Sequence, residues 1–314
     1  MLTRNINIES NINTDPLCIT IGNFDGIHKG HQFIIKKLIK ESTKLNLLPT
    51  VLSFSPHPSK FFNRINKNFN ILLENDKETI LKSLGIKVYY KLIFNEITAD
   101  LSAQDFVNIF LINKLKMKSL VIGENFRFGK NREGNIDLLN KLSKKNNFSL
   151  NIVKSVKFRN SNLVYSSSII RKNIEEGNFK DTNKFLGRPW TIKGLVQAGD
   201  KRAREMNFPT ANILIPDIIN PKKGVYIVKI ILAEKKYLGI ANFGRRPTFD
   251  GKKVLLEVNI FNFNREIYGK ELTVEFLTFI REEIKFNNFD ELKKQVNKDV
   301  LLAKSFFDNK KYEN

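Results

Sequence analysis

The 314-residue sequence has a single cysteine and no long apolar run. Its one cysteine, Cys18, allows no internal disulfide and no cluster of zinc-binding thiolates. No run of about 18 apolar residues occurs, which argues against a transmembrane helix. Residues 1–16 are polar and lack the apolar centre of a signal peptide. We therefore expect a soluble cytoplasmic protein with no membrane partner.

Acidic residues are also few, with 32 Asp and Glu against 53 Lys and Arg, which gives a net charge of +21. Such a charge can indicate nucleic-acid binding, since basic chains release counterions from phosphate polymers. The lysines are spread through the chain instead of gathering in one tail, and Asn and Ile are also abundant. We interpret the charge as a bias towards AT-rich codons and expect no specific nucleic-acid partner. Weak, salt-sensitive binding to RNA or anionic surfaces is the alternative. We expect at most a weak or transient homo-oligomer.

Histidine is scarce too, and two of the three histidines lie in one short segment, residues 22–31. This segment joins an apolar, β-branched run at residues 17–21 to a run with helical spacing at residues 33–38, so we expect it to bridge a strand and a helix. Its three glycines let an anion approach the backbone, and the N–H groups of the helix start face the same space. His28 and His31 could point imidazole N–H groups at one phosphate. The segment predicts a phosphate site, and the alternative is a capped turn with two surface histidines.

The sequence of residues 22–31, GNFDGIHKGH, resembles the G-x-F-D-x-x-H-x-G-H signature of the nucleotidyltransferase superfamily. Its GNFDG version is similar to the first half of bacterial bifunctional riboflavin kinase/FMN adenylyltransferases, also called FAD synthetases. The resemblance implies that His28 and His31 are catalytic. It also implies an ATP site that includes Gly22, Phe24, Asp25 and Gly30. His57 resembles the histidine of the family's F-x-P-H-P segment, or is a turn histidine exposed by its neighbouring prolines.

A second glycine-rich loop, residues 123–134, contains Gly-Lys but does not fit a P-loop. Five residues separate Gly123 from Gly129 where a P-loop has four, and Lys130 is followed by Asn. Its arginines and aromatic residues suit a phosphorylated, flat-ringed ligand, and a surface loop without function is the alternative. The loop resembles the family's G-x-D/N-F-x-F-G-x-x-R-x-G segment, which implies that Asn125 and Arg127 contact FMN.

Three serines stand at the start of an expected helix in residues 165–171, YSSSIIR. A serine at a helix N-terminus is a cap, and this explains one of the three. With Arg171 one turn into the helix, the hydroxyls form a second corner suited to phosphate. The stretch resembles the superfamily's S-S-T-x-x-R motif, which implies that Ser167, Ser168 and Arg171 bind ATP phosphates. Ser168 stands where threonine is usual.

Strands and helices alternate through residue 186, which predicts a parallel sheet with helices on both faces, a Rossmann-like α/β domain. Helical spacing then stops, and six strand patterns follow at short intervals. Strands without intervening helices predict a six-stranded antiparallel β-barrel, and a last helix is expected from Asn288 or Asp290 to Phe307. On the resemblance, residues 1–186 are the FMN adenylyltransferase domain and residues 187–314 the riboflavin kinase domain.

Three motifs of the second domain resemble those of riboflavin kinases: GDKRAREMNFPTAN at residues 199–212, NFGRRPTF at 242–249 and LEVN at 256–259. The first is similar to a loop that ends in G-F-P-T-A-N, which implies that Thr210 and Asn212 bind Mg²⁺ and ATP phosphate, and oxygen donors suit this hard cation. The third resembles L-E-V-H, which implies that Glu257 is the base for the riboflavin 5′-hydroxyl. An outward-facing strand charge is the alternative for Glu257. The expected ATP and flavin site also includes Gly199, Arg204 and Arg246.

The chain departs from these family motifs at four positions. Ala203 and Asn207 stand where glycine is usual, Met206 replaces leucine, and Asn259 replaces histidine. Ala203 would be strained if the loop needs a positive φ there, whereas asparagine tolerates that conformation. Closure of the loop over the kinase site is therefore the part of the resemblance with the least support.

The resemblance implies a bifunctional enzyme that converts riboflavin and ATP to FMN, and FMN and ATP to FAD and pyrophosphate, with Mg²⁺ as cofactor. One alternative is a nucleotidyltransferase that acts on another phosphomonoester and carries a second domain that only binds flavin. The other is a non-catalytic RNA- or flavin-binding protein with a decayed site. The intact HxGH and PTAN motifs and Glu257 favour the enzyme.

Overall fold

The computed structural model describes residues 1–64, 68–158, 163–197, 208–248 and 251–309, and leaves the side chains of residues 245–248 and 251–253 undescribed. The chain divides into two compact units, Met1–Ser167 and Ser168–Asn314.

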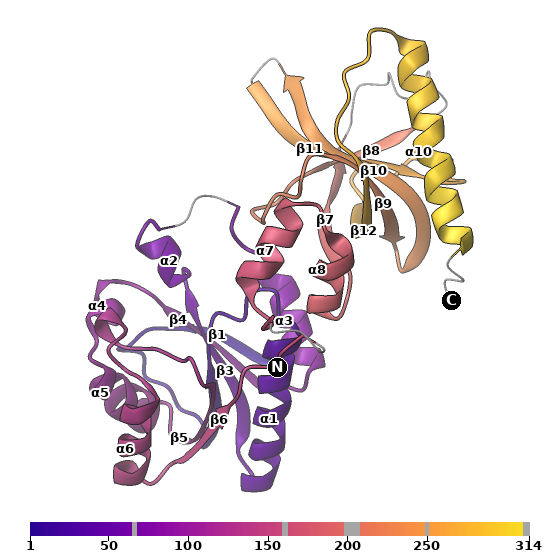
Figure 1. Ribbon diagram of the computed structural model, residues 1–314. Helices are drawn as coiled ribbons and strands as arrows, with labels where there is room; N and C mark the ends of the chain where they lie inside the picture. Colours follow the sequence, from indigo (N-terminus) through magenta and orange to yellow (C-terminus); the bar gives the residue numbers. More distant parts are fainter. Residues whose placement is uncertain (65–67, 159–162, 198–207, 249–250, 310–314) are drawn as a thin grey trace. The chain divides into compact units, whose positions relative to one another are not determined.

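The first unit is built on a six-stranded parallel sheet with the strand order β1-β4-β3-β2-β5-β6 (Figure 1). The strands are β1 (Leu2–Ile6), β2 (Leu17–Ile21), β3 (Leu48–Ser55), β4 (Val88–Ile93), β5 (Met117–Gly123) and β6 (Ser149–Val153). From β2 the chain extends the sheet in one direction through β3 and β4, and then in the other through β5 and β6. The order of the strands thus reverses between the neighbouring strands β2 and β5. In α/β sheets, ligands bind at such a switch point, outside the carboxyl ends of the strands.

Helices cover both faces of this sheet, as the alternating pattern predicts. They are α1 (Lys29–Leu45), α2 (Pro58–Phe61), α3 (Glu74–Ser83), α4 (Glu96–Asp100), α5 (Ala103–Asp105), the π-helix η1 (Phe106–Lys114), the 3₁₀ turn η2 (Lys130–Arg132) and α6 (Ile136–Asn146). Side chains along β2 alternate between the faces. Ile19 packs in one cluster with Phe110 of η1 and Leu139 of α6. Cys18 packs in the other cluster, with Leu38 of α1.

The second unit contains the predicted six-stranded antiparallel barrel, closed in the order β10-β11-β8-β7-β12-β9. Its strands are β7 (Trp190–Gln197), β8 (Thr210–Leu214), β9 (Gly224–Leu232), β10 (Lys235–Thr248), β11 (Gly251–Ile260) and β12 (Glu271–Arg281). The last helix, α10 (Phe289–Asn309), is fastened to β12 because Arg281 donates from Nη2 to the buried Asp299 carboxylate at 2.7 Å. The Nε of Arg281 also donates to this carboxylate.

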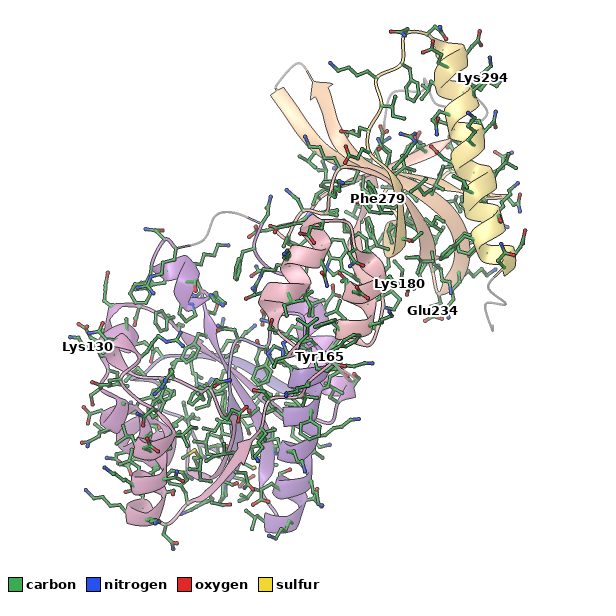
Figure 2. All side chains as sticks on the ribbon, viewed as in Figure 1. Lys130, Tyr165, Lys180, Glu234, Phe279 and Lys294 are labelled. Carbon is green, nitrogen blue, oxygen red and sulfur yellow. The ribbon has the colours of Figure 1, made fainter. Side chains whose placement is uncertain are left out.

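Two helices precede the barrel, α7 (Ser167–Glu175) and α8 (Phe179–Leu186). Phe179 of α8 is fully buried and lies 5.4 Å from the Trp190 ring and 5.0 Å from the Phe276 ring, measured between ring centroids. Asn183 joins α8 to two strands, since its amide donates to the Phe276 carbonyl and its oxygen accepts from the Trp190 N–H. Farther along β12, Phe279, labelled in Figure 2, contacts Tyr226 of the same aromatic group. Helix α8 is therefore part of the barrel's packing.

The compact units divide the chain after residue 167, whereas the sequence placed the domain boundary at residue 186. The assignment of one activity to residues 1–186 and the other to residues 187–314 stays a prediction.

A fragment of residues 168–314 should unfold cooperatively, and a fragment of residues 186–314 should be far less stable, because it lacks Phe179 and Asn183. Removing a buried phenylalanine alone costs about 3–5 kcal/mol of unfolding free energy. Urea unfolding followed by the fluorescence of Trp190, the single tryptophan, measures both fragments. Phe289→Ala in the longer fragment is the control, since this side chain is 48% exposed. Equal stability of the two fragments would contradict the account of α8.

Candidate functional site

The turn after β2 has an unusual backbone. Phe24 and Ile27 adopt φ values of 49° and 38°, and Gly26 adopts 81°. Positive φ is uncommon outside glycine and persists where the surrounding packing enforces it, often at functional sites. The side chains of Phe24 and Ile27 are fully buried, so the core holds the turn in place.

Asp25 fixes this turn to two other segments. Both carboxylate oxygens accept from the Ile71 N–H, at 2.9 and 3.2 Å, and the Asp25 carbonyl accepts from the Ser167 hydroxyl at 2.9 Å. Such a buried carboxylate holds loops together through charge-assisted hydrogen bonds. The ATP contact that the sequence assigns to Asp25 stays a prediction.

The two histidines of the turn lie face to face at the start of α1. Their ring centroids are 3.7 Å apart and the ring planes differ by 17°. His28 is the N-cap, and its Nδ1 accepts from the His31 backbone N–H at 3.3 Å. In the neutral ring the proton is therefore on Nε2. His31 Nδ1 is buried and has no hydrogen-bond partner among the described residues, as is expected where a ligand completes the site.

Burial and nearby charges keep His31 neutral. Burial lowers the pKa of His31 well below its usual value, and the nearby positive charges of His28 and Lys77 lower it further. Lys77 belongs to α3, where its Nζ donates to Glu74 Oε2 at 3.0 Å. Burial alone would raise the pKa of Glu74, but the charge of Lys77 and the hydrogen bond from Tyr89 bring it below the usual range. The His31 imidazole is thus uncharged at neutral pH.

Gly30 is required by packing. A Cβ at this position would lie 3.1 Å from the His28 ring and 3.1 Å from Cβ of Tyr165, a tighter approach than side chains normally make. At Gly22 a Cβ would lie 3.3 Å from the Phe24 ring. These glycines let the chain fold closely around the histidines.

A cavity of about 330 Å³ lies at the switch point of the sheet. Four segments line it: the turn with His28 and His31, the loop after β5 with Asn125, the stretch after β6, and residues 164–167. The structure therefore brings together five predicted site residues from distant parts of the sequence: His28, Gly30, His31, Asn125 and Ser167.

Other predicted residues of this site do not line the cavity. Gly22, Phe24, Asp25 and Arg127 are not among the residues that line the cavity, and Arg127 is exposed. Ser168 and Arg171 belong to the second compact unit, and their contact with the nucleotide stays a prediction. The sequence did not single out Ser155, which lies 3.4 Å from Asn125 Nδ2 and donates its backbone N–H to Glu124 at 2.8 Å.

The second candidate site lies on two neighbouring strands of the barrel. Glu257 of β11 is directly opposite Asn212 of β8, and Asn259 is opposite Thr210. Directly paired residues of antiparallel strands have their side chains on the same face, about 5 Å apart at Cβ. The alternate residues, such as Leu256, are fully buried in the barrel. The strand register thus gathers the predicted base and the predicted metal ligands on one outer face.

The same row continues across the sheet. Asn242 of β10 is opposite Glu257, and Gln197 of β7 is opposite Asn212. Sequence reasoning noted the motif that contains Asn242 but assigned neither residue to the site, because it could not give the strand register. Among the described residues, the buried Asn212 Oδ1 has no hydrogen-bond partner, so an oxygen donor is available on this face.

A cavity of about 700 Å³ adjoins this face and is lined by Pro209, Thr210 and Asn259, among others. Asn212 and Glu257 are not among its lining residues. The predicted residues Gly199 and Arg204 lie outside the described residues, as does the side chain of Arg246. No group of three His, Cys, Asp or Glu side chains suited to a metal ion occurs within the described ranges.

Two family models match the chain, FAD synthetase over residues 10–168 and riboflavin kinase over residues 186–307. Similar known proteins include two bifunctional riboflavin kinase/FMN adenylyltransferases. The one from Haemophilus influenzae is 39% identical and covers 93% of this chain and 94% of its own. The one from Buchnera aphidicola of Schizaphis graminum is 37% identical over 98% of both chains.

A solved structure also resembles the whole chain. It is described as a macrolide-efflux protein from Streptococcus pneumoniae, with a TM-score of 0.86, 32% identity and coverage of 97% of this chain and 99% of its own. In the described part of this protein, every helix is too short or too polar to cross a membrane. Family models over both halves and relatives of nearly equal length agree, and the chain belongs to the family of bifunctional riboflavin kinase/FMN adenylyltransferases.

Proposed function

We propose that this protein makes flavin cofactors in two steps, in the cytoplasm. It phosphorylates riboflavin with ATP to give FMN, and it transfers the adenylyl group of a second ATP to FMN to give FAD and pyrophosphate. The observation that carries the proposal is the presence of two separate sites, each with the residues that its reaction needs: the stacked histidines at the switch point, and Glu257 opposite Asn212 on the barrel.

In adenylyl transfer, a phosphate oxygen of FMN attacks the α-phosphorus of ATP and pyrophosphate leaves on the opposite side. No protein nucleophile is needed, so catalysis consists of positioning and charge stabilisation. His28 donates from Nε2 and His31 from its ring N–H to the α-phosphate. A neutral His31 ring can donate a hydrogen bond without giving up a proton, and the N-terminal end of α1 adds its dipole.

The remaining groups of the first site bind the two substrates. Asn125 and Arg127 bind FMN, and Ser167, Ser168 and Arg171 hold the pyrophosphate as it leaves. Gly22, Phe24 and Asp25 shape the turn beside the nucleotide, and Gly30 lets the triphosphate approach the helix start.

In riboflavin phosphorylation, the 5′-hydroxyl attacks the γ-phosphorus of ATP, ADP leaves on the opposite side, and Glu257 accepts the hydroxyl proton. The hydroxyl of Thr210 and the unpaired Oδ1 of Asn212 fit Mg²⁺, which takes oxygen ligands from few protein groups together with substrate phosphates. When bound there, Mg²⁺ neutralises charge on the phosphates. Gly199, Arg204 and Arg246 complete the ATP and flavin site.

His31→Ala should lower the conversion of FMN to FAD by about 10² to 10³-fold, the usual loss when one preorganised donor to a developing charge is removed. The conversion of riboflavin to FMN should be unchanged. Each half-reaction is started from its own flavin, and the products are separated by chromatography. Equal loss of both half-reactions would mean misfolding or one shared site, and would contradict the assignment.

Glu257→Gln keeps the shape of the side chain but cannot accept the hydroxyl proton, so riboflavin phosphorylation should fall by about 10² to 10⁴-fold. Adenylylation of added FMN should persist. Glu271→Gln, the same substitution at an exposed position of β12, is the matched control and should retain both activities. Phosphorylation by Glu257→Gln at the rate of the control would show that Glu257 is only a strand residue.

A further inference from the structure

Asn259 on β11 makes a specific contact with the chain just before Thr210. Its side-chain Nδ2 donates to the Pro209 carbonyl at 2.9 Å. The residue is almost fully buried, at 9% exposed. It is also the direct cross-strand partner of Thr210, so the residue that binds the Pro209 carbonyl lies opposite the next residue of the chain.

This peptide determines where Thr210 points. The peptide group is planar, so fixing the Pro209 oxygen also fixes the direction in which the Thr210 Cα leaves the plane. Thr210 is the first residue of β8, so Pro209 precedes the strand and is not held by its ladder. Proline has no N–H of its own, so its carbonyl is the only backbone group through which this residue can be held.

We propose that Asn259 is a positioning residue of the kinase site, which acts by holding the Pro209–Thr210 peptide so that the Thr210 hydroxyl is presented to the metal and phosphate. The inference rests on the proposed function, in which Thr210 is a ligand. The proposed positioning role requires a hydrogen-bond donor at position 259. Asparagine and histidine both supply one, and an apolar side chain of similar size does not.

The test compares Asn259→Leu, which keeps the branching and the number of heavy atoms but removes the donor, with Asn259→His, which restores a donor on a different shape. Both are made in the full-length protein.

The first readout is the riboflavin phosphorylation rate as a function of Mg²⁺ concentration, with adenylylation of FMN in the same protein as the internal control. The second readout needs no turnover: the rise in melting temperature caused by ADP with Mg²⁺, followed by the fluorescence of Trp190. Trp190 is the single tryptophan and is buried in the barrel, so this melting transition reports the second unit.

Asn259→Leu should raise the Mg²⁺ concentration for half-maximal phosphorylation by about tenfold, and should weaken ADP binding about tenfold, the effect of roughly one hydrogen bond. At an ADP concentration of about 100 times the wild-type Kd, a tenfold loss of affinity halves the stabilisation of the second unit. Asn259→His should come within about threefold of the wild type in both readouts. FMN adenylylation should be the same in all three proteins.

Three results separate the possible failures. A wild-type protein that makes no FMN from riboflavin would reject the proposed function itself. A wild-type protein that makes FMN, beside an Asn259→Leu variant with unchanged Mg²⁺ dependence and unchanged ADP stabilisation, would overturn the inference. A loss in Asn259→Leu that Asn259→His shares in full would overturn it too, because the effect would then follow the shape of the side chain and not the donor.

Discussion

The pairing of strands, and above all its register, is the constraint on which both sites depend. In the first unit, parallel pairing of β2 with β5 brings the turn with His28 and His31 to the same edge of the sheet as the loop with Asn125. In the barrel, the register of β8 with β11 sets Glu257 opposite Asn212. A shift of one residue would turn these side chains into the barrel and expose Leu256 and Val258. Burial of the alternate apolar residues inside the barrel therefore holds Glu257 and Asn212 on its outer face.

In the proposed first site, His31 is a neutral hydrogen-bonding group. Burial, the charge of the stacked His28 ring and the nearby Lys77 disfavour its imidazolium form, so the proposed phosphate contacts use N–H groups and a helix terminus. The barrel site, in contrast, combines a carboxylate with amide and hydroxyl oxygens, a set suited to proton transfer and to a metal-bound phosphate. The two proposed sites thus use different chemical groups for the same nucleotide.

The sequence was sufficient to predict the fold class and most of the elements, because buried strands such as β2 and β9 are continuous apolar runs and the helices have clear spacing. It gave no sign of β1, where only Ile6 is buried, because an edge strand with polar side chains lacks the alternation that marks a strand. The helix after Ser102 begins with a side-chain cap, in which the Ser102 hydroxyl accepts from the Asp105 N–H, but most of this helix is a π-helix, which the spacing of its residues does not reveal. The packing of Phe179 on Trp190 is a tertiary contact that helical spacing does not reveal, and the boundary at residue 186 stays a prediction. Motifs likewise identified Thr210, Asn212 and Glu257, whereas their register and the bond from Asn259 to Pro209 required the structure.

The central claim is that one chain transfers the γ-phosphoryl group of ATP at one site and the adenylyl group at the other. The most direct test supplies riboflavin, Mg²⁺ and ATP radiolabelled at either the α- or the γ-phosphorus, and follows the label in the separated flavins. The account predicts that the γ-label appears in FMN and persists in FAD, and that the α-label appears in FAD alone. Entry of the α-label into FMN, or the absence of γ-label from both flavins, would contradict it.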